Sequence, residues 1–344
     1  MLKHDFMPNQ PHLILRLAAF GRRVADFCQQ LFHPRELFSS RETRDQQANL
    51  NAHQDKPATR DSGQRSAPLL IHYHIFKNAG SSFEWALQEA FGHDYRSFDS
   101  PTPRGFISGD ELAELALRHP GVRAIASHQA APPPPTIPER EVVTSILIRD
   151  PIARIRSIYA FERSQQAGTP GALKAKELSF RGYVEWRLQT APDMLCNFQV
   201  HFCTRTAEKQ TGAPNRERLE KAISNLDATS IVGTVARYDE WIALAERILA
   251  SSFPGLSLPS VRRNATARTA LPEVAILEQL VSELGENTAQ FLIKNNELDM
   301  CLHQVADALL TRRLAERGVR ISLLQAYTDA QQAQVNRSHV VNAP

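Results

Sequence analysis

The chain has 344 residues, of which 42% are hydrophobic and 22% are charged, and its formal net charge is +3. This length can bury one large core with extensions, and the small excess of positive charge fits polyanionic ligands but argues against nucleic-acid binding. The four cysteines lack C-x-x-C spacing, which argues against a zinc site and against a dense disulfide framework.

Residues 1–66 are predicted to form an amphipathic helix followed by a flexible linker. Apolar residues recur at spacings of three and four between residues 13 and 31, so one face of this helix is expected to be apolar. That face could pack on protein, on a second copy of the chain or on an anionic membrane surface, and packing on protein is favoured. Charged residues within the segment exclude a transmembrane helix, and no secretory cleavage site is evident. The polar compositions of residues 39–67 and 324–344 indicate a linker and a polar C-terminal tail.

The most informative segment is a strand-like run at 69–75 that ends in a short turn and continues as a helix over 81–91. Backbone N–H groups at the start of a helix favour an anion, Lys77 adds a full charge, and Gly80 lets the backbone approach a ligand closely. The turn lacks the glycine spacing of nucleotide hydrolases, so a phosphate-like group other than ATP is expected. A solvated surface lysine is the alternative interpretation. The candidate anion-binding residues are Lys77, Asn78, Ala79, Gly80, Ser81 and Ser82.

A second strand-like run at 122–126 is followed by His128 and then by a proline-rich loop. Because the carboxyl ends of parallel strands open at one edge of a sheet, His128 is expected near the Lys77 turn. A histidine with a pKa near neutrality is the usual acceptor of a proton from a hydroxyl group. His128 is therefore the candidate general base, although a polar loop residue is the ordinary interpretation of such a position.

A third run at 142–148 ends at Arg149 and passes through Asp150 and Pro151 into a predicted helix. Asp150 suits the N-cap of that helix, and Pro151 suits its first turn. Ser157 lies two turns along the helix, and an arginine together with a hydroxyl makes a phosphate clamp. An Arg–Asp surface pair with a solvent-facing serine is the alternative.

Strand-like and helix-like segments alternate along residues 67–323, which predicts an α/β domain with a parallel central sheet covered by helices. His72, within the first run, is expected to point into the core. The predicted strands lie near residues 69–75, 122–126, 142–148 and 231–234, and the predicted helices cover residues 81–91, 151–164, 238–250, 273–293 and 297–317.

These segments resemble the PAPS-dependent carbohydrate sulfotransferases of the heparan sulfate 2-O-sulfotransferase type, including their bacterial relatives. In that family the motif H-I-P-K-x-A-G-T-S binds the 5′-phosphosulfate, and residues 74–82 read H-I-F-K-N-A-G-S-S, with Phe76 in place of proline. The family motif R-D-P-x-x-R-x-x-S-x-Y binds the 3′-phosphate, and residues 149–159 match every fixed position. Weaker similarity continues at residues 197–205, 231–249, 262–268 and 295–307, so the resemblance spans about residues 67–317.

The resemblance implies a P-loop NTPase-like three-layer fold and in-line transfer of a sulfuryl group to a carbohydrate hydroxyl, with PAPS as cosubstrate and no metal. Positioning and charge stabilisation dominate such a loose transition state. Lys77 would contact the leaving 5′-phosphate oxygen, and the rest of its turn would hold the remaining oxygens. Arg149 and Ser157 would bind the 3′-phosphate. The family carries an arginine that matches Arg205, which would touch the cosubstrate or the acceptor, with a solvated surface position as the alternative. Apart from the resemblance, Arg262 and Arg263 lie in a basic segment that could close over the 3′-phosphate or over an anionic sugar.

The resemblance also bears on the general base. The resembling enzymes carry a His-x-His pair after the second strand-like run, and the second histidine is the base. This chain has Ala126 in the first position, so His128 is expected to act as the single imidazole. Three other residues are alternative bases, namely Glu84, Glu162 and His201.

Two functions of other classes stay open. One is a P-loop kinase-like phosphotransferase, which would need a magnesium-binding aspartate, and the other is a non-catalytic nucleotide- or glycan-binding module. Animal members of the resembling family are Golgi enzymes with a membrane anchor, and no anchor is evident here, so a bacterial cytoplasmic location is expected. The expected partner is a glycan, and peripheral membrane contact or self-association would involve the N-terminal helix.

Overall fold

The computed structural model describes residues 67–102, 105–206, 208, 212–259 and 273–318. The predicted N-terminal helix and linker, the segment that contains Arg263, and the tail from residue 324 therefore lie outside the described residues. Two compact units are distinguished, a larger one of Ser66–Ala267 with Leu298–Pro344 and a smaller one of Met1–Arg65 with Arg268–Glu297. Within the described ranges, no helix combines the length and the apolar character needed to cross a membrane.

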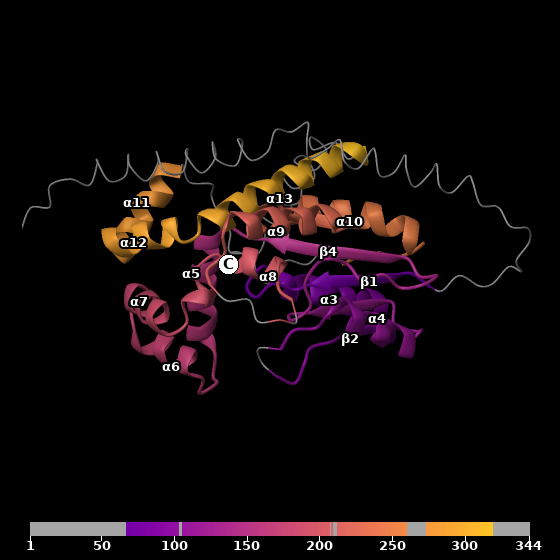
Figure 1. The fold of residues 1–344 in the computed structure, drawn as a ribbon, viewed down its shortest axis with the longest axis horizontal. Coiled ribbons are helices and arrows are strands. Elements are labelled where there is room, and N and C mark those ends of the chain that lie inside the picture. The colour runs from indigo at the N-terminus through magenta and orange to yellow at the C-terminus, as the bar shows by residue number, and fades with distance from the viewer. Residues whose placement is uncertain (1–66, 103–104, 207, 209–211, 260–272, 319–344) are drawn as a thin grey trace, which may run out of the picture. The chain divides into compact units, whose positions relative to one another are not determined.

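A five-stranded sheet forms the centre of the larger unit, and each pair of neighbouring strands in it is parallel. The strands are β1 (Leu69–Tyr73), β2 (Tyr95–Ser97), β3 (Ala124–Ser127), β4 (Val142–Ile148) and β5 (Ile231–Thr234), in the spatial order β2-β3-β1-β4-β5. Figure 1 shows β1 and β4 side by side, with helices around them. Helices flank the sheet. The predicted α/β fold is therefore confirmed, and it is compatible with a P-loop-like three-layer arrangement.

Helices of the larger unit connect the strands and flank the sheet. They are α3 (Gly80–Phe91), α4 (Gly109–Arg118), α5 (Pro151–Ser164), α6 (Pro170–Glu177), α7 (Phe180–Thr190), α8 (Phe198–Cys203), α9 (Arg216–Ala228), α10 (Tyr238–Ser252) and α13 (Glu297–Glu316). The smaller unit contains α11 (Glu273–Leu284) and α12 (Glu286–Lys294). The sequence analysis did not predict α4 or α6 to α9. A capping box of Ser108 and Glu111 at the start of α4 was a signal that could have located that helix.

The single helix predicted over residues 273–293 is wrong. The described part of the smaller unit consists of α11 and α12, and Gly285 separates them with a φ of 75°. Glycine enters this region of positive φ without the steric cost that a Cβ would add, so the chain turns there and starts a new helix.

Both faces of the sheet are buried, which explains why its strands read as continuous apolar runs. Every residue of β1 and of β3 is buried. His72 points into the core as predicted, where its Nδ1 lies 3.1 Å from the hydroxyl oxygen of Ser145. On one face, α3, α10 and α13 pack against the strands through side chains that include Leu70, Phe83, Val143, Trp241 and Leu310.

Candidate functional site

The predicted site residues of the larger unit gather at one edge of the sheet. The strands are parallel, so their carboxyl ends open at the same edge. From β1 the chain proceeds to β2 and β3 on one side and then crosses to β4 on the other, which makes the edge beside β1 a topological switch point. Lys77 follows β1, Asp99 follows β2, His128 follows β3 and Arg149 follows β4.

The turn between β1 and α3 has a constrained backbone. Lys77 and Ala79 have φ values of 66° and 61°, in the left-handed region that disfavours residues with a Cβ. Gly80 begins α3, and a Cβ on it would lie 2.0 Å from Cδ2 of His74. Gly80 therefore makes room for the imidazole of His74, a neighbour that the sequence analysis did not identify.

Lys77 and Arg149 meet across the gap between β1 and β4. Nη1 of Arg149 donates to the carbonyl oxygen of Lys77 at 2.8 Å. Burial lowers the pKa of Lys77, and the nearby charge of Arg149 lowers it further. The Lys77 ammonium nitrogen lies 4.1 Å from the centroid of the Phe161 ring, within the range of a cation–π contact. Two cations in such proximity favour a ligand with more than one negative charge.

A buried hydrogen-bond network fixes the Lys77 turn against the end of β4. Asn78 donates from Nδ2 to the carbonyl oxygen of Leu147 at 2.8 Å and to Oε1 of Gln199 at 2.7 Å. Gln199 also accepts from the backbone N–H of Arg149 at 2.9 Å and donates to the Arg149 carbonyl oxygen at 2.8 Å. Asn78, a predicted cofactor-binding residue, thus joins the two loops, and its Oδ1 is buried without a hydrogen-bond partner.

Asp299 on α13 holds Gln199 in place. Its carboxylate accepts from the backbone N–H groups of Gln199 at 3.0 Å and of Val200 at 2.8 Å, in the first turn of α8. Oδ1 of Asn197 accepts in return from the backbone N–H groups of Leu298 and Asp299, at 3.2 and 3.1 Å. Burial raises the pKa of Asp299. The two distant segments around residues 197–205 and 295–307 therefore form one structural support for the loops that carry Lys77 and Arg149.

Arg154, in α5, supports the turn that carries Lys77. It is buried, and its guanidinium donates to the carbonyl oxygens of Phe76 at 3.2 Å and of Met194 at 2.9 Å. The Arg154 guanidinium carbon lies 3.8 Å from the centroid of the Phe198 ring. Burial lowers the pKa of Arg154 to about 9. Arg154 therefore braces the residue before Lys77.

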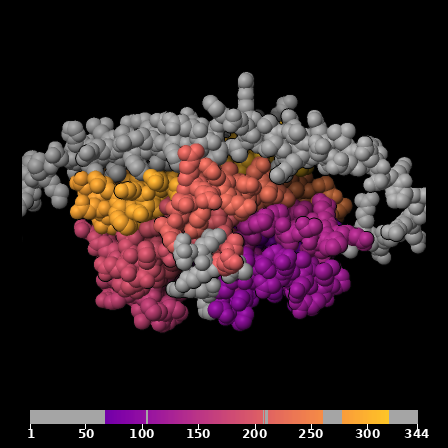
Figure 2. Space-filling model, in the orientation of Figure 1, coloured from indigo at the N-terminus to yellow at the C-terminus, as the bar shows by residue number. Residues whose placement is uncertain are grey.

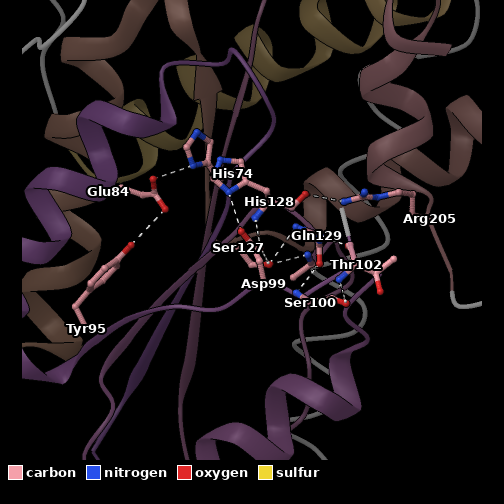
Figure 3. Close-up of polar contacts among 11 residues, drawn as sticks. His74, Glu84, Tyr95, Asp99, Ser100, Thr102, Ser127, His128, Gln129 and Arg205 are labelled. Carbon is pink, nitrogen blue, oxygen red and sulfur yellow. Dashed lines mark hydrogen bonds and ion pairs between the residues drawn. The ribbon is translucent and has the colours of Figure 1, made fainter. Parts of the chain in front are cut away.

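His128 is oriented by a carboxylate that the sequence analysis missed. Oδ1 of Asp99 accepts from the backbone N–H of His128 at 2.8 Å and from the Ser127 hydroxyl at 2.9 Å, while Oδ2 lies 3.1 Å from Nδ1 of His128 (Figure 3). The hydrogen bond that the Asp99 carboxylate accepts from His128 raises the pKa of His128, and partial burial opposes that rise. The carboxylate fixes the ring orientation and leaves Nε2 as the nitrogen that can accept a proton.

A second imidazole lies against His128. The ring centroids of His74 and His128 are 4.0 Å apart with a 30° tilt, and Nδ1 of His74 lies 3.2 Å from Oε2 of Glu84 (Figure 3). Burial lowers the pKa of His74, against the raising effect of Glu84. Burial would raise the pKa of Glu84, but His74, His128 and Tyr95 together lower it. The prediction of a single imidazole in this part of the site is therefore wrong.

Arg205 reaches the same edge from the segment after α8. Its Nη2 donates to the carbonyl oxygen of His128 at 3.1 Å, and its guanidinium carbon lies 4.2 Å from the centroid of the Phe202 ring. Burial lowers the pKa of Arg205 to about 10. In the space-filling view, the orange-red part of the chain around α8 and α9 adjoins the indigo and magenta part that carries the first strands (Figure 2). Arg205 is thus placed beside the candidate base.

The remaining predicted residues have diverse environments. In α3, Ser81 is exposed and Ser82 is buried, whereas Ser157 is half-buried in α5. Glu162 accepts at 2.5 Å from both the Tyr183 hydroxyl and the Arg187 guanidinium. Nδ1 of His201 lies 2.7 Å from Nη2 of Arg218, and burial lowers the pKa of His201. Of the three alternative bases, Glu84 alone lies in the group around His128, so far as the described contacts show.

Comparison with known proteins adds one relative. No family model matches the chain. A protein of Archaeoglobus fulgidus, described only as uncharacterized, is 29% identical over 238 residues, which cover 68% of this chain and 94% of that protein. The similarity extends over nearly the whole archaeal protein but names no activity. The chemistry of the site itself therefore bears most directly on function.

Proposed function

We propose that this chain is a PAPS-dependent sulfotransferase that moves a sulfuryl group from PAPS to a hydroxyl group of a carbohydrate. The observation that carries the proposal is the contact between the two motif-bearing loops, in which Arg149 donates to the carbonyl oxygen of Lys77 at 2.8 Å. PAPS bears a phosphosulfate at its 5′ end and a phosphate at its 3′ end. Two cationic loops on adjacent strand ends suit such a ligand better than two unrelated surface charges do.

We assign to Lys77 the role of stabilising the negative charge that develops on the leaving group. The acceptor oxygen forms a bond to sulfur while the bond between sulfur and the 5′-phosphate oxygen breaks, and adenosine 3′,5′-bisphosphate (PAP) departs. A cation fixed in advance stabilises that charge without reorganisation. The N–H of Ser82 donates to the Ala79 carbonyl oxygen at 3.2 Å, so the amides of Gly80 and Ser81 are the better candidates for holding the remaining oxygens.

Arg149 and Ser157 are assigned the 3′-phosphate. Arg149 follows β4 directly, and Ser157 lies half-buried two turns along α5. An arginine presents a planar fork of donors that matches the geometry of a phosphate. Because Arg149 also contacts the Lys77 turn, a ligand bound at one loop would affect the position of the other loop.

We assign to His128 the role of general base, which takes the proton from the acceptor hydroxyl group. Asp99 holds its Nδ1, at 3.1 Å, and leaves Nε2 to accept the proton as the acceptor oxygen attacks sulfur. A carboxylate that orients an imidazole in this way also stabilises the imidazolium that forms. Arg205, which contacts the carbonyl oxygen of His128, would place a positive charge next to the acceptor. An acidic saccharide suits that charge.

The test is a comparison of Lys77→Ala with wild type in an assay that follows transfer of ³⁵S from labelled PAPS to a panel of glycans. Loss of a charge-stabilising donor typically lowers kcat by about 10²–10³-fold. The affinity for PAP, measured by isothermal titration calorimetry, should fall much less. Lys221→Ala removes an exposed lysine of α9 and serves as the matched control. A kcat of Lys77→Ala within a few-fold of wild type would refute the assignment.

The same titrations separate the proposal from its rivals. A kinase-like phosphotransferase would bind ATP with magnesium in preference to PAP. A non-catalytic module could bind PAP but would transfer no label to any glycan. Binding of PAP in preference to ATP, together with labelled product, is the outcome that the proposal requires.

A further inference from the structure

Three side chains from separate segments converge beside the edge of the sheet. His74 follows β1, Glu84 lies in α3, and His128 follows β3. Each offers one nitrogen or oxygen atom, and these atoms lie within 4.8 Å of one another. Two imidazoles and a carboxylate are a set of ligands that transition metals accept, whereas magnesium and calcium prefer oxygen alone.

The innermost of these atoms has one close polar contact. Nδ1 of His74 is buried and lies 3.2 Å from Oε2 of Glu84, in a geometry that does not make a regular hydrogen bond. His74 as a whole is 4% exposed. A ring nitrogen and a carboxylate oxygen that face each other at this distance could share a bound cation.

Outer contacts orient the three side chains. Asp99 occupies Nδ1 of His128 at 3.1 Å, which leaves Nε2 for another ligand. The Tyr95 hydroxyl donates to Oε1 of Glu84 at 3.3 Å, which leaves Oε2 directed to His74. Metal-binding histidines commonly donate their second ring nitrogen to a carboxylate in this manner.

We propose that His74, Glu84 and His128 form a binding site for a divalent transition metal ion with the coordination preferences of zinc. In a tetrahedral zinc site the metal lies about 2.0–2.1 Å from nitrogen and oxygen ligands, which places neighbouring ligand atoms about 3.4 Å apart. The distance of 3.2 Å between His74 and Glu84 already fits that value. The other ligand atoms of the group lie within 4.8 Å of one another, so binding of the metal would draw the half-buried Glu84 and His128 side chains closer together. Three protein ligands leave a fourth position for water or another molecule, as in zinc sites that are not purely structural.

The proposal goes beyond sulfuryl transfer and does not depend on it. Metal binding involves His74 and Glu84, to which transfer assigns no role, and it needs neither Lys77 nor Arg149. The two activities share one atom, because Nε2 of His128 cannot hold a metal ion and accept a proton at the same time. An occupied site would therefore silence a base at this position.

The test is titration of the full-length, chelator-treated protein with Co²⁺, followed by its visible d–d absorption, and then displacement with Zn²⁺ followed by calorimetry. One ion per chain with a tetrahedral spectrum is expected. Glu84→Gln and His128→Gln should each weaken Co²⁺ binding at least tenfold, and Asp99→Asn should weaken it about 10–100-fold by releasing the His128 ring. His119→Ala, which removes an exposed histidine after α4, should leave binding unchanged.

Circular dichroism verifies that each variant folds. His74→Ala removes the buried ligand directly, and if that variant does not fold, Glu84→Gln tests the site with His74 still in place. Absence of Co²⁺ and Zn²⁺ binding by the wild type would overturn the proposal. Equal binding by the wild type and by the Glu84 and His128 variants would also overturn it, since the ion would then sit elsewhere. A parallel titration with PAP distinguishes the two proposals. If the protein binds Co²⁺ but not PAP, only the proposed function fails, and if it binds PAP but not Co²⁺, only the metal site fails.

Discussion

Gln199 supports the loops that carry Lys77 and Arg149, and Gln199→Leu is therefore predicted to have a large effect on stability. Gln199 is wholly buried, and its side chain bonds to Asn78, to both backbone groups of Arg149 and, more weakly at 3.3 Å, to Asp299. Leucine has a similar volume but satisfies none of these groups. Four polar groups lose their bond to Gln199, at about 1 kcal/mol each, which predicts a loss of about 3–5 kcal/mol in the free energy of unfolding.

Urea denaturation followed by circular dichroism measures this loss as a lower midpoint. Gln88→Leu makes the same substitution at an exposed position of α3, and it should change the free energy of unfolding by less than about 0.5 kcal/mol. PAP affinity should also fall in Gln199→Leu, because both loops lose their common partner. If Gln199→Leu and Gln88→Leu unfold at the same urea concentration, the network does not support the loops and the reasoning is refuted.

Three further predictions concern the edge of the sheet and α5. Gly80→Ala should destabilise the chain by about 1–3 kcal/mol in urea, because its Cβ would meet the His74 ring; wild-type stability would contradict this. Tyr183→Phe should cost about 1–2 kcal/mol in the same assay, since it removes the hydroxyl between Glu162 and Arg187, and no loss would show that hydroxyl to be dispensable. Zn²⁺ should inhibit sulfuryl transfer and a chelator should restore it, whereas inhibition that persists in Glu84→Gln would place the inhibitory ion elsewhere.

The sequence predicted the strands that carry long apolar runs and missed the one that does not. β1, β3, β4 and β5 are buried, so their composition alone revealed them. β2 has three residues, none of them buried, and no apolar run marked it. That strand leads into Asp99, so the partner of His128 was missed together with the strand.

Contacts between segments that are distant in the sequence are the second feature that could not be predicted. The sequence showed weak similarity around Gln199 and around Asp299, but nothing in it indicated that these residues touch. They are 100 positions apart, and their contact follows from the way α8 and α13 meet. Asn78 was assigned to ligand binding for the same reason, because its partner Gln199 could not be foreseen. Polar residues near a motif can serve the loops rather than the ligand.

The register of β1 against β3 explains how the second imidazole reaches His128. His72 pairs with Ala126 and Tyr73 with Ser127, and the N–H of His74 donates to the carbonyl oxygen of Ser127 at 2.9 Å. Neighbouring strands lie about 4.8 Å apart, so the next residue on each strand brings two imidazoles side by side at the edge of the sheet.

The pairing of β1 with β3 also shows which residue lies beside Ala126. Its neighbour His72 is buried against Phe83 and Trp241, with ring centroids 4.8 and 6.3 Å away, and is closed off from the edge. His74, which matches the first residue of the motif at residues 74–82, brings a second imidazole to His128 from the adjacent strand, although Ala126 stands at the first place of the expected His-x-His pair. Oε2 of Glu84 lies 3.2 Å from Nδ1 of that second imidazole, so the proposed metal site includes two residues, His74 and Glu84, that lie outside the expected His-x-His pair.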